Sequence, residues 1–232
     1  MANKRFGGRT LARSQALQVL FQAEATGKTV DEVLSGEYAI TDGPLDPFGE
    51  ADARGAGEML PVLDVIISQA STHWTVPRMP AVDRNILRLA TYEMLEVDEV
   101  AVPITIDEFV ELSKAYGTDE SSRFVNGVLG RIADRIEAGE DVVGDATRER
   151  ERLDEEERRR REEAERAAAE RAAAEEAERA AEAEGAGAGE DGARKGGQGS
   201  PAAPEGARPQ AGDDGFEVFR PASFDEGEGS WE

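Results

Sequence analysis

The chain has 232 residues, a net charge of −23 and no cysteine, so disulfides and thiol chemistry are excluded. The N-terminal segment lacks the apolar core of a signal peptide, and no apolar run reaches the roughly 18 residues that a membrane span requires. We therefore expect a cytoplasmic protein with no membrane association.

Apolar residues are concentrated in the first 140 residues, and the chain beyond Val143 consists mostly of Glu, Arg, Ala, Gly and Pro. This change in composition predicts one globular domain over 1–140, close to the commonest domain size. A charged segment over 141–184, either helical or disordered, should follow it. The acidic, Gly- and Pro-rich tail over 185–232 is predicted to be disordered.

The N-terminal segment is basic although the protein is acidic. No acid occurs within 1–23, and its basic residues are Lys4, Arg5, Arg9 and Arg13. Arginines one turn apart at the start of a helix attract phosphate, which indicates a nucleic-acid-binding arm. A solubilising terminus is the alternative. Because Arg9 and Arg13 lie at a helix start, their replacement is expected to leave the fold intact.

The helical periodicity of the apolar residues predicts an all-α domain of six or seven helices. Helices are expected over 10–25, around 29–36, over 50–74 with a break or kink at Pro61, over 81–95, over 104–117 and over 121–139. Thr10 is the predicted N-cap of the first helix, and Thr105 with Glu108 predicts a capping box. Gly27 and Gly117 are predicted helix ends.

The stretch SSRFVNGVLG, residues 121–130, combines an arginine, an aromatic and a glycine near a helix start. Phe124 can stack on an unpaired base while Arg123 meets a phosphate. Spacing alone favours a core position for Phe124. Gly127 costs about 1 kcal/mol relative to alanine inside a helix, which predicts that a neighbouring helix packs closely against it.

No feature indicates catalysis or a bound cofactor. The single histidine, His73, has no cysteine or second histidine with which to bind a metal, so a structural role is expected. Neither a glycine-rich phosphate loop nor a distinct carboxylate pair is present. We therefore expect a protein that is not an enzyme and holds no metal or cofactor.

The charged segment over 147–184 is rich in helix formers and has no large apolar seam apart from Leu153, so a solvated single helix or a partly helical stretch is favoured over a coiled coil. Its expected i,i+4 ion pairs are Glu155–Arg159, Glu156–Arg160, Glu157–Arg161 and Glu162–Arg166. Further on, residues 215–232 contain four aromatics: Phe216, Phe219, Phe224 and Trp231. They are either accidental in a solubilising tail or anchors of a docking motif. A third alternative is that the acidic tail folds back on the basic arm and competes with RNA.

Three runs of the sequence resemble the NusB family of transcription antitermination factors. They are RSQALQVLFQAE (13–24), RMPAVDRNILRLATYEML (78–95) and KAYGTDESSRFVNGVL (114–129). The resemblance covers roughly residues 5–138, weakens over 36–60 and has no counterpart for the tail from about 141. It implies an all-α NusB-like fold of two packed three-helix bundles.

The resemblance also implies a function, which is binding of the boxA element in the leader of nascent ribosomal RNA transcripts, together with the ribosomal protein NusE, within the transcription elongation complex. By the family pattern, the RNA-binding residues are Arg9, Arg13, Gln15, Glu120, Arg123 and Phe124. The residues implied to bind the partner protein are Tyr92 and Glu93. Whether the chain forms a homodimer is left open.

Two other functions are weighed against this one. NusB-like domains also occur fused to RNA cytosine methyltransferase domains, but nothing that resembles a cofactor-binding α/β domain follows residue 140. The remaining alternative is a helical protein-binding adaptor without RNA affinity of its own. The two differ in whether Arg9 and Arg13 matter for binding RNA.

Overall fold

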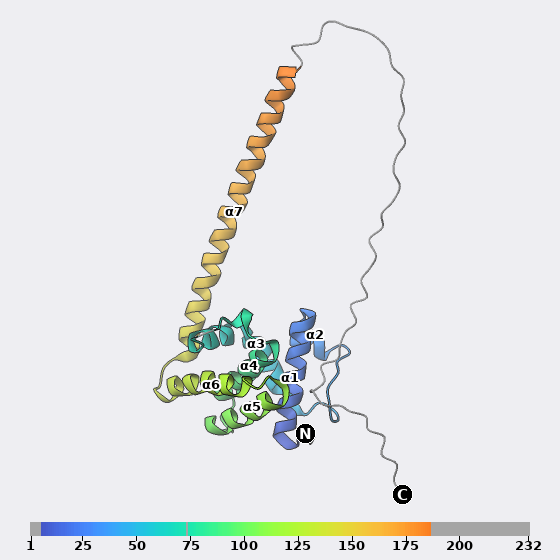
Figure 1. Cartoon of the computed structure of the whole chain (residues 1–232), viewed down its shortest axis with the longest axis vertical. Coiled ribbons are helices and arrows are strands. Elements are labelled where there is room, and N and C mark those ends of the chain that lie inside the picture. The colour runs from blue at the N-terminus through green and yellow to red at the C-terminus, as the bar shows by residue number, and fades with distance from the viewer. Residues whose placement is uncertain (1–5, 73, 187–232) are drawn as a thin grey trace. The chain divides into compact units, whose positions relative to one another are not determined.

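The structure, a computed structural model, describes residues 6–72 and 74–186. Every regular element in these two ranges is helical, which confirms the all-α prediction (Figure 1). The elements in chain order are α1 (Gly8–Thr26), α2 (Val30–Leu34), α3 (Pro47–Ala70), the 3-10 helix η1 (Val76–Arg78), α4 (Ala81–Glu96), α5 (Val102–Tyr116), α6 (Ser121–Glu137) and α7 (Val142–Ala186).

Several helices begin and end at local sequence signals, of which the predicted end at Gly27 is one. Gly27 ends α1 in the left-handed conformation, with φ of 65°. A capping box between Thr29 and Glu32 starts α2, and the Asp46 side chain caps α3 by accepting a hydrogen bond from the Phe48 amide at 2.8 Å. The segment around Pro61 forms one helix rather than two.

Two predicted caps are wrong because their side chains bind other helices. Thr10 lies inside the first turn of α1, and its hydroxyl donates to Glu108 Oε2 at 2.6 Å. Thr105 and Glu108 lie inside α5 and make no capping box. Thr105 instead donates to Glu93 Oε1 of α4 at 2.7 Å. The spacing that is typical of a cap is used here for tertiary contacts.

The helices form two groups of three around one apolar core. Helices α1, α2 and α3 pack on one another, as do α4, α5 and α6, and α4 joins the groups through contacts with α1 and α3. The largest fully buried side chains include Leu17, Leu63, Ile86, Phe109 and Ile132. At Gly49, α3 approaches α1 so closely that an added Cβ would collide with the carbonyl oxygen of Ala12. This arrangement agrees with the expected pair of three-helix bundles.

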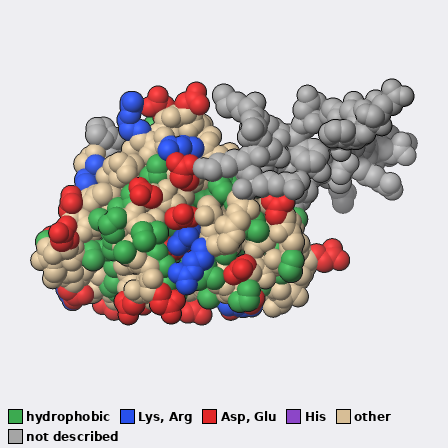
Figure 2. Space-filling view, turned by 90° about the horizontal axis from the view of Figure 1, so that it is seen from below, with side chains coloured by type: hydrophobic (Ala, Val, Ile, Leu, Met, Phe, Trp, Pro, Cys, Tyr) green, Lys and Arg blue, Asp and Glu red, His purple; other side chains and the backbone are tan. Residues whose placement is uncertain are grey.

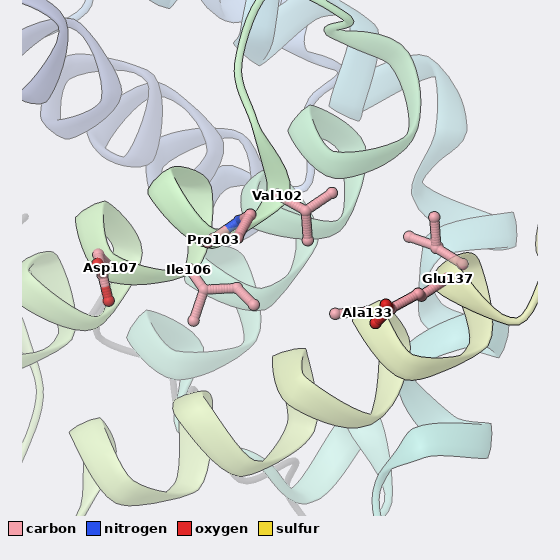
Figure 3. A pocket seen from close by; sticks show the side chains of 7 residues that line it. Val102, Pro103, Ile106, Asp107, Ala133 and Glu137 are labelled. Carbon is pink, nitrogen blue, oxygen red and sulfur yellow. The ribbon is translucent and has the colours of Figure 1, made fainter.

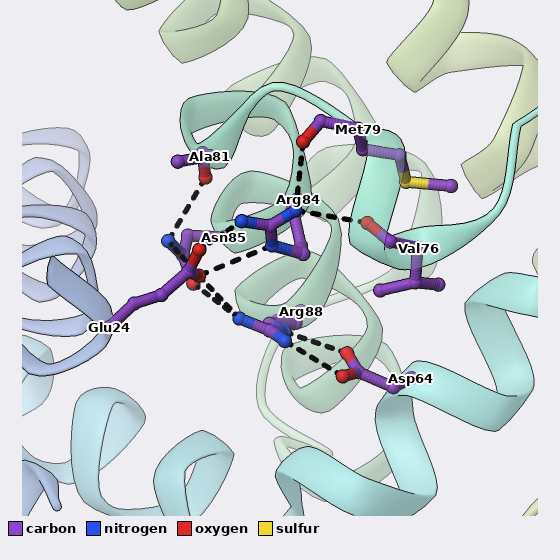
Figure 4. A network of polar contacts seen from close by, with 8 residues as sticks. All are labelled: Glu24, Asp64, Val76, Met79, Ala81, Arg84, Asn85 and Arg88. Carbon is purple, nitrogen blue, oxygen red and sulfur yellow. Dashed lines mark hydrogen bonds and ion pairs between the residues drawn. The ribbon is translucent and has the colours of Figure 1, made fainter. Parts of the chain in front are cut away.

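A polar network ties the C-terminal part of α1 to α3 and α4 (Figure 4). Glu24 of α1 accepts hydrogen bonds from Arg84, Asn85 and Arg88 of α4. Arg88 also donates to both carboxylate oxygens of Asp64 in α3, at 2.7 Å each. Removing one member would leave its partners uncompensated in a partly buried site. The network therefore fixes the orientation of these three helices.

The chain divides into two compact units, and α7 contributes to both. The first unit runs to Arg152, because Val142 and Ala146 in the first turns of α7 are buried in the same core cluster as the rest of the domain. The compact unit thus extends beyond the expected end at residue 140. The second unit starts at Leu153.

Within the second unit the described side chains of α7 are exposed on all sides, apart from the half-buried Glu156. The expected pair between Glu156 and Arg160 forms at 2.7 Å. Arg159 and Arg161 instead pair with acids one turn further on, Glu163 and Glu165. The expectations for His73 and for the aromatics over 215–232 lie outside the described residues.

The predicted close packing against Gly127 is wrong. A Cβ built on this glycine would meet only the Nη1 atom of Arg131, at 3.8 Å. The buried face of α6 is formed by other residues, namely Ser121, Val125, Val128, Leu129 and Ile132. The glycine is therefore not required by a neighbouring helix.

Replacing Gly127 with alanine should stabilise the first unit by about 0.5–1 kcal/mol, because alanine loses less conformational freedom in a helix and has room here. Gly49→Ala is the matched control, since the same change in α3 should destabilise the fold through the collision with Ala12. Thermal melts of both variants measure the two effects. A lower melting temperature for Gly127→Ala than for wild type would contradict the open environment of this residue.

Candidate nucleic-acid interface

The start of α6 presents three of the predicted RNA-binding residues. Arg123 and Glu120 are 89% and 83% exposed, and their charged atoms are 3.9 Å apart, which makes a weak surface contact. Phe124 is half-buried and packs against the apolar core. The two alternatives for Phe124 are therefore combined, because the ring is anchored in the core and still meets solvent.

The turn before α6 is held by residues that sequence reasoning missed. The Ser121 hydroxyl accepts a hydrogen bond from the Thr118 amide at 2.8 Å. A Cβ at Gly117 would lie 2.5 Å from the Ser121 side chain, so the glycine permits this close turn. Asp83 of α4 is buried against Ser121, and burial raises the pKa of this carboxyl. An acid in the first turn of a helix is usually exposed, so nothing in the sequence indicates that Asp83 is buried.

A stack of two aromatic rings and a hydrogen bond between two hydroxyl groups join the start of α1 to the end of α5. The rings of Phe6 and Tyr116 are stacked with centroids 6.1 Å apart. The hydroxyl groups of Tyr116 and Ser14 lie 2.6 Å apart. Because Tyr116 is the last residue of α5, these contacts place the start of α1 beside the turn that leads into α6. Arg9 therefore lies in a helix that contacts α5, and Arg123 lies in the helix that follows α5 in the chain.

Of the two arginines in α1, Arg9 is the exposed one. Its side chain is 52% exposed, lies 4.9 Å over the Phe48 ring and approaches Glu99 to 3.8 Å. The stacking on Phe48 restrains the guanidinium, and the contact with Glu99 is too exposed to hold it tightly. Arg9 thus keeps a solvent-facing charge that can meet a phosphate.

Arg13 is buried, with 2% of its surface exposed. Its Nε and Nη2 atoms donate to the two carboxylate oxygens of Glu93 at 2.7 and 2.8 Å, and Nη1 donates to Glu108 at 3.2 Å. This bidentate geometry is the strongest kind of arginine–carboxylate contact. A direct contact between Arg13 and RNA stays a prediction, and the side chain observed here joins α1 to α4 and α5. The expectation that the fold tolerates loss of Arg13 is replaced by the opposite prediction, because Glu93 would stay buried without its partner.

Gln15 and Glu93 are also buried, whereas Tyr92 is half-buried. The Gln15 amide donates to the carbonyl oxygens of Thr41 and Pro44 and accepts from the Asp46 amide, so it holds the loop before α3. Glu93 is fully enclosed with Arg13. Tyr92 crosses α3 at Gly55, where an added Cβ would collide with the tyrosine ring. Of the two predicted partner-binding residues, only Tyr92 reaches the surface.

A second carboxylate shares the site of Arg13. Asp52 of α3 is 3% exposed, hydrogen-bonds Glu93 and leaves its Oδ2 atom without a partner. Burial, together with the negative charge of Glu93, raises the pKa of Asp52 to about 7. The nearby positive charges of Arg13 and Arg9 act in the opposite direction and are outweighed. Near neutral pH the carboxyl of Asp52 therefore holds a proton part of the time.

The surface of the first unit is predominantly acidic. Figure 2 shows one face on which a small group of Lys and Arg side chains lies among more numerous acidic ones, with patches of hydrophobic side chains beside them. Among residues 6–72 and 74–186, no cluster of three or more His, Asp or Glu side chains is suited to a metal ion. No helix in the described part of the chain combines the length and apolar character of a membrane span.

Two three-helix groups packed around one apolar core define an all-α domain. A model of the NusB family matches residues 10–134, which is more than half of the chain. The transcription antitermination protein NusB of Sorangium cellulosum is 44% identical over 134 residues, which are 56% of this chain and 94% of that protein. The same-named protein of Desulfitobacterium hafniense is 40% identical over 133 residues, covering 55% of this chain and 89% of that protein. The chain belongs to the NusB family.

Parts of two solved structures are also similar to this chain. NusB of T. maritima is 38% identical, with a TM-score of 0.49 over 56% of this chain and 93% of that chain. A chain from the crystal structure of antitermination factors NusB and NusE in complex with dsRNA is 25% identical, with a TM-score of 0.46 over 54% of this chain and 96% of that chain. The family match ends before α7 begins.

Replacing Arg13 with methionine should destabilise the domain by about 3–5 kcal/mol, because it leaves Glu93 as an uncompensated buried charge. Arg9→Met is the matched control and should change the free energy of unfolding by less than about 0.5 kcal/mol, since Arg9 is a surface residue. Urea unfolding at pH 7 measures both. Equal, small effects of the two substitutions would contradict the buried ion pair.

The protein should become less stable as the pH rises from about 4 to 7 through the titration of Asp52. The folded state binds this proton up to a pKa of about 7, whereas the unfolded aspartate loses it near 3.8. The free energy of unfolding therefore falls across this window, by up to about 4 kcal/mol at 1.36 kcal/mol for each pKa unit.

The test is Asp52→Asn, which still has an N–H to donate to Glu93. The variant should match wild type near pH 4 and be more stable at pH 8, when stability is measured by urea unfolding at a series of pH values. Asp98→Asn, at an exposed position, is the control and should run parallel to wild type. An Asp52→Asn curve that also runs parallel to wild type would contradict the assignment.

Proposed function

We propose that this chain is a transcription antitermination factor that binds the boxA element of nascent ribosomal RNA transcripts together with the ribosomal protein NusE. The relatives at 40–44% identity carry the name transcription antitermination protein and are matched over about nine-tenths of their length. This function implies work in the cytoplasm as part of the transcription elongation complex.

One observation carries the RNA-binding part of the proposal. Arg9 at the start of α1 and Arg123 at the start of α6 are both exposed, and Phe6 and Ser14 contact Tyr116 at the end of α5, from which the turn into α6 begins. Phe124 offers part of a ring next to Arg123. Single-stranded RNA is held in this way, by cations on its phosphates and by aromatic rings on its bases.

The buried members of the predicted site act through the exposed ones. Arg13 and Glu93 hold α1 against α4 and α5, and Gln15 fixes the loop that leads into α3. We assign RNA contact to Arg9, Glu120, Arg123 and Phe124, and positioning to Arg13 and Gln15. For the partner protein, Tyr92 is the residue that offers a surface, and Glu93 supports its helix from inside.

The adaptor alternative is favoured by one observation, which is the acidic surface. Burial of Arg13 removes one of the cations on which the RNA-binding arm was predicted to rely. An acidic protein binds RNA weakly unless its few cations are well placed. The two functions are separated by titrating the full chain with a boxA-like RNA and with a permuted RNA of the same composition, each with and without the ribosomal partner. Tighter binding of the boxA-like RNA supports the proposal, and equal weak binding of both RNAs under all conditions supports the adaptor.

In the same titration, the double variant Arg9→Ala/Arg123→Ala should weaken RNA binding and reduce the slope of log affinity against log salt by about 0.7 for each lost phosphate contact. Lys28→Ala is the charge control, because Lys28 is exposed at the opposite end of α1, roughly 28 Å away along a helix of 19 residues. A slope that changes as much for Lys28→Ala as for one of the arginines would remove this edge from the RNA site.

A further inference from the structure

An apolar groove lies between the first turns of α5 and the last turns of α6 (Figure 3). Its lining is apolar in the middle and acidic at the rim, and consists of Val102, Pro103, Ile106, Asp107, Ala133, Ile136 and Glu137. The volume is about 500 Å³, which is within the range of ligand-binding pockets. The groove lies about 15–20 Å along α6 from Arg123, so it is separate from the proposed RNA edge.

The groove leaves apolar surface uncovered by the described residues. Val102, Ile106 and Ile136 are only half-buried, although all three pack against the core. Ile104, in the same first turn of α5, is 55% exposed. In Figure 3 the side chains of Val102 and Ile106 extend from α5 toward α6, on which Ala133 lies. The small side chain of Ala133 leaves the space into which another side chain could insert.

The polar groups of the groove are carboxylates that have no ion-pair partner among the described residues. Asp107 on α5 and Glu137 on α6 are both exposed, and in Figure 3 they lie on opposite sides of the apolar centre. A pocket for a small organic ligand would instead offer several converging hydrogen-bond groups near its centre. An apolar centre between two carboxylates fits a segment with apolar anchors and flanking cations.

The charge of the rim distinguishes three candidate occupants of the groove: a segment of the same chain, a second copy of the chain and another protein. The segment over 215–232 of this chain has apolar anchors but carries five acidic residues and one basic residue, so it would meet the rim carboxylates with like charge. A second copy of the chain would bring a net charge of −23 toward the same rim. A basic partner has the complementary charge and can form an ion pair with each of the two carboxylates.

The walls of the groove decide the form of the occupant. Both walls are helices, so no strand edge is available for an added strand. The mode that remains is a helix laid in a groove, with apolar residues at i, i+3, i+4 and i+7. We propose that this groove is a docking site for a basic amphipathic helix of another protein. The proposal rests on the groove alone and is independent of the proposed RNA binding.

The probe is a synthetic peptide of about 14 residues with leucine at i, i+3, i+4 and i+7 and lysine at the other positions. It is titrated into the full chain carrying ¹³C-labelled Ile, Val and Ala methyl groups, and binding is followed by methyl NMR and fluorescence anisotropy. The expected result is saturable shifts of the Val102, Ile106, Ala133 and Ile136 methyl signals. A peptide with the same residues in scrambled order and a Leu/Glu peptide of the same pattern should bind at least about tenfold more weakly.

Variants locate the binding site. Asp107→Asn/Glu137→Gln should weaken binding of the Leu/Lys peptide by about two- to fivefold for each carboxylate, which is the range for exposed ion pairs. Ala133→Lys, which fills the groove and adds a like charge, should weaken it by more than about tenfold. Glu37→Gln/Glu58→Gln removes the same charge from exposed positions elsewhere in the first unit and should leave the affinity unchanged. If Ala133→Lys fails to fold, the rim variant and its control still decide the question.

Four results would overturn the proposal. One is no binding of the Leu/Lys peptide to wild type, and another is equal weakening by the rim variant and its control, which would mean nonspecific attraction to an acidic protein. In the third, replacing the four aromatics of 215–232 with serine in the full chain shifts the groove methyl signals without peptide, which would assign the groove to the chain's own tail. In the fourth, these signals change on dilution of the protein alone, which would assign the groove to a second copy.

Discussion

The bidentate contact between Arg13 and Glu93 is the interaction on which the candidate interface depends. It is buried where α1, α3, α4 and α5 meet, and Thr105, Glu108 and Asp52 complete its surroundings. A buried ion pair contributes little net stability, but loss of one partner is costly because the other charge stays buried. The pair therefore acts chiefly as a constraint on geometry. It allows α1 to pack against α4 in only one register, and that register sets the direction in which the Arg9 side chain projects.

This constraint changes the physical picture of how the chain would bind RNA. A basic arm that bound mainly by charge would need several free cations, and α1 offers one. Binding would then rely on placement, with Arg9 held at the start of α1, Arg123 and the half-exposed Phe124 held at the start of α6, and a partner protein supplying further contacts. The buried Asp52 adds a pH dependence to the same constraint, because its ionisation would put a second negative charge beside Glu93. The stability of the proposed RNA-binding edge would thus follow that of the polar cluster behind it.

Much of the fold could be predicted from the sequence, because apolar periodicity and glycine stops are local signals. The helices over 81–95 and 10–25 were predicted to within about two residues of α4 and α1. The misplaced features all depend on tertiary contacts. Thr105 and Glu108 have the spacing of a capping box but bind Glu93 and Arg13, and Gly127 has open space on a helix where a close neighbour was expected. For the site, residue type identified Arg9, Arg123 and Phe124 as candidates, but it could not distinguish the exposed Arg9 from the buried Arg13 one turn later. That distinction depends on Glu93, which is 80 residues away in the sequence.

If Arg13 positions the interface without touching RNA, the double variant Arg13→Met/Glu93→Gln should still bind RNA. Removing both charges leaves neither position 13 nor position 93 as an unpaired buried ion, and the glutamine can still accept hydrogen bonds from Thr105 and Asp52. The measurement is the affinity of this variant for boxA-like RNA, beside its free energy of unfolding and that of Arg13→Met alone. The double variant should be more stable than Arg13→Met and should bind RNA within about threefold of wild type. A folded double variant whose RNA affinity falls by tenfold or more would instead show that the Arg13 guanidinium itself contacts the RNA.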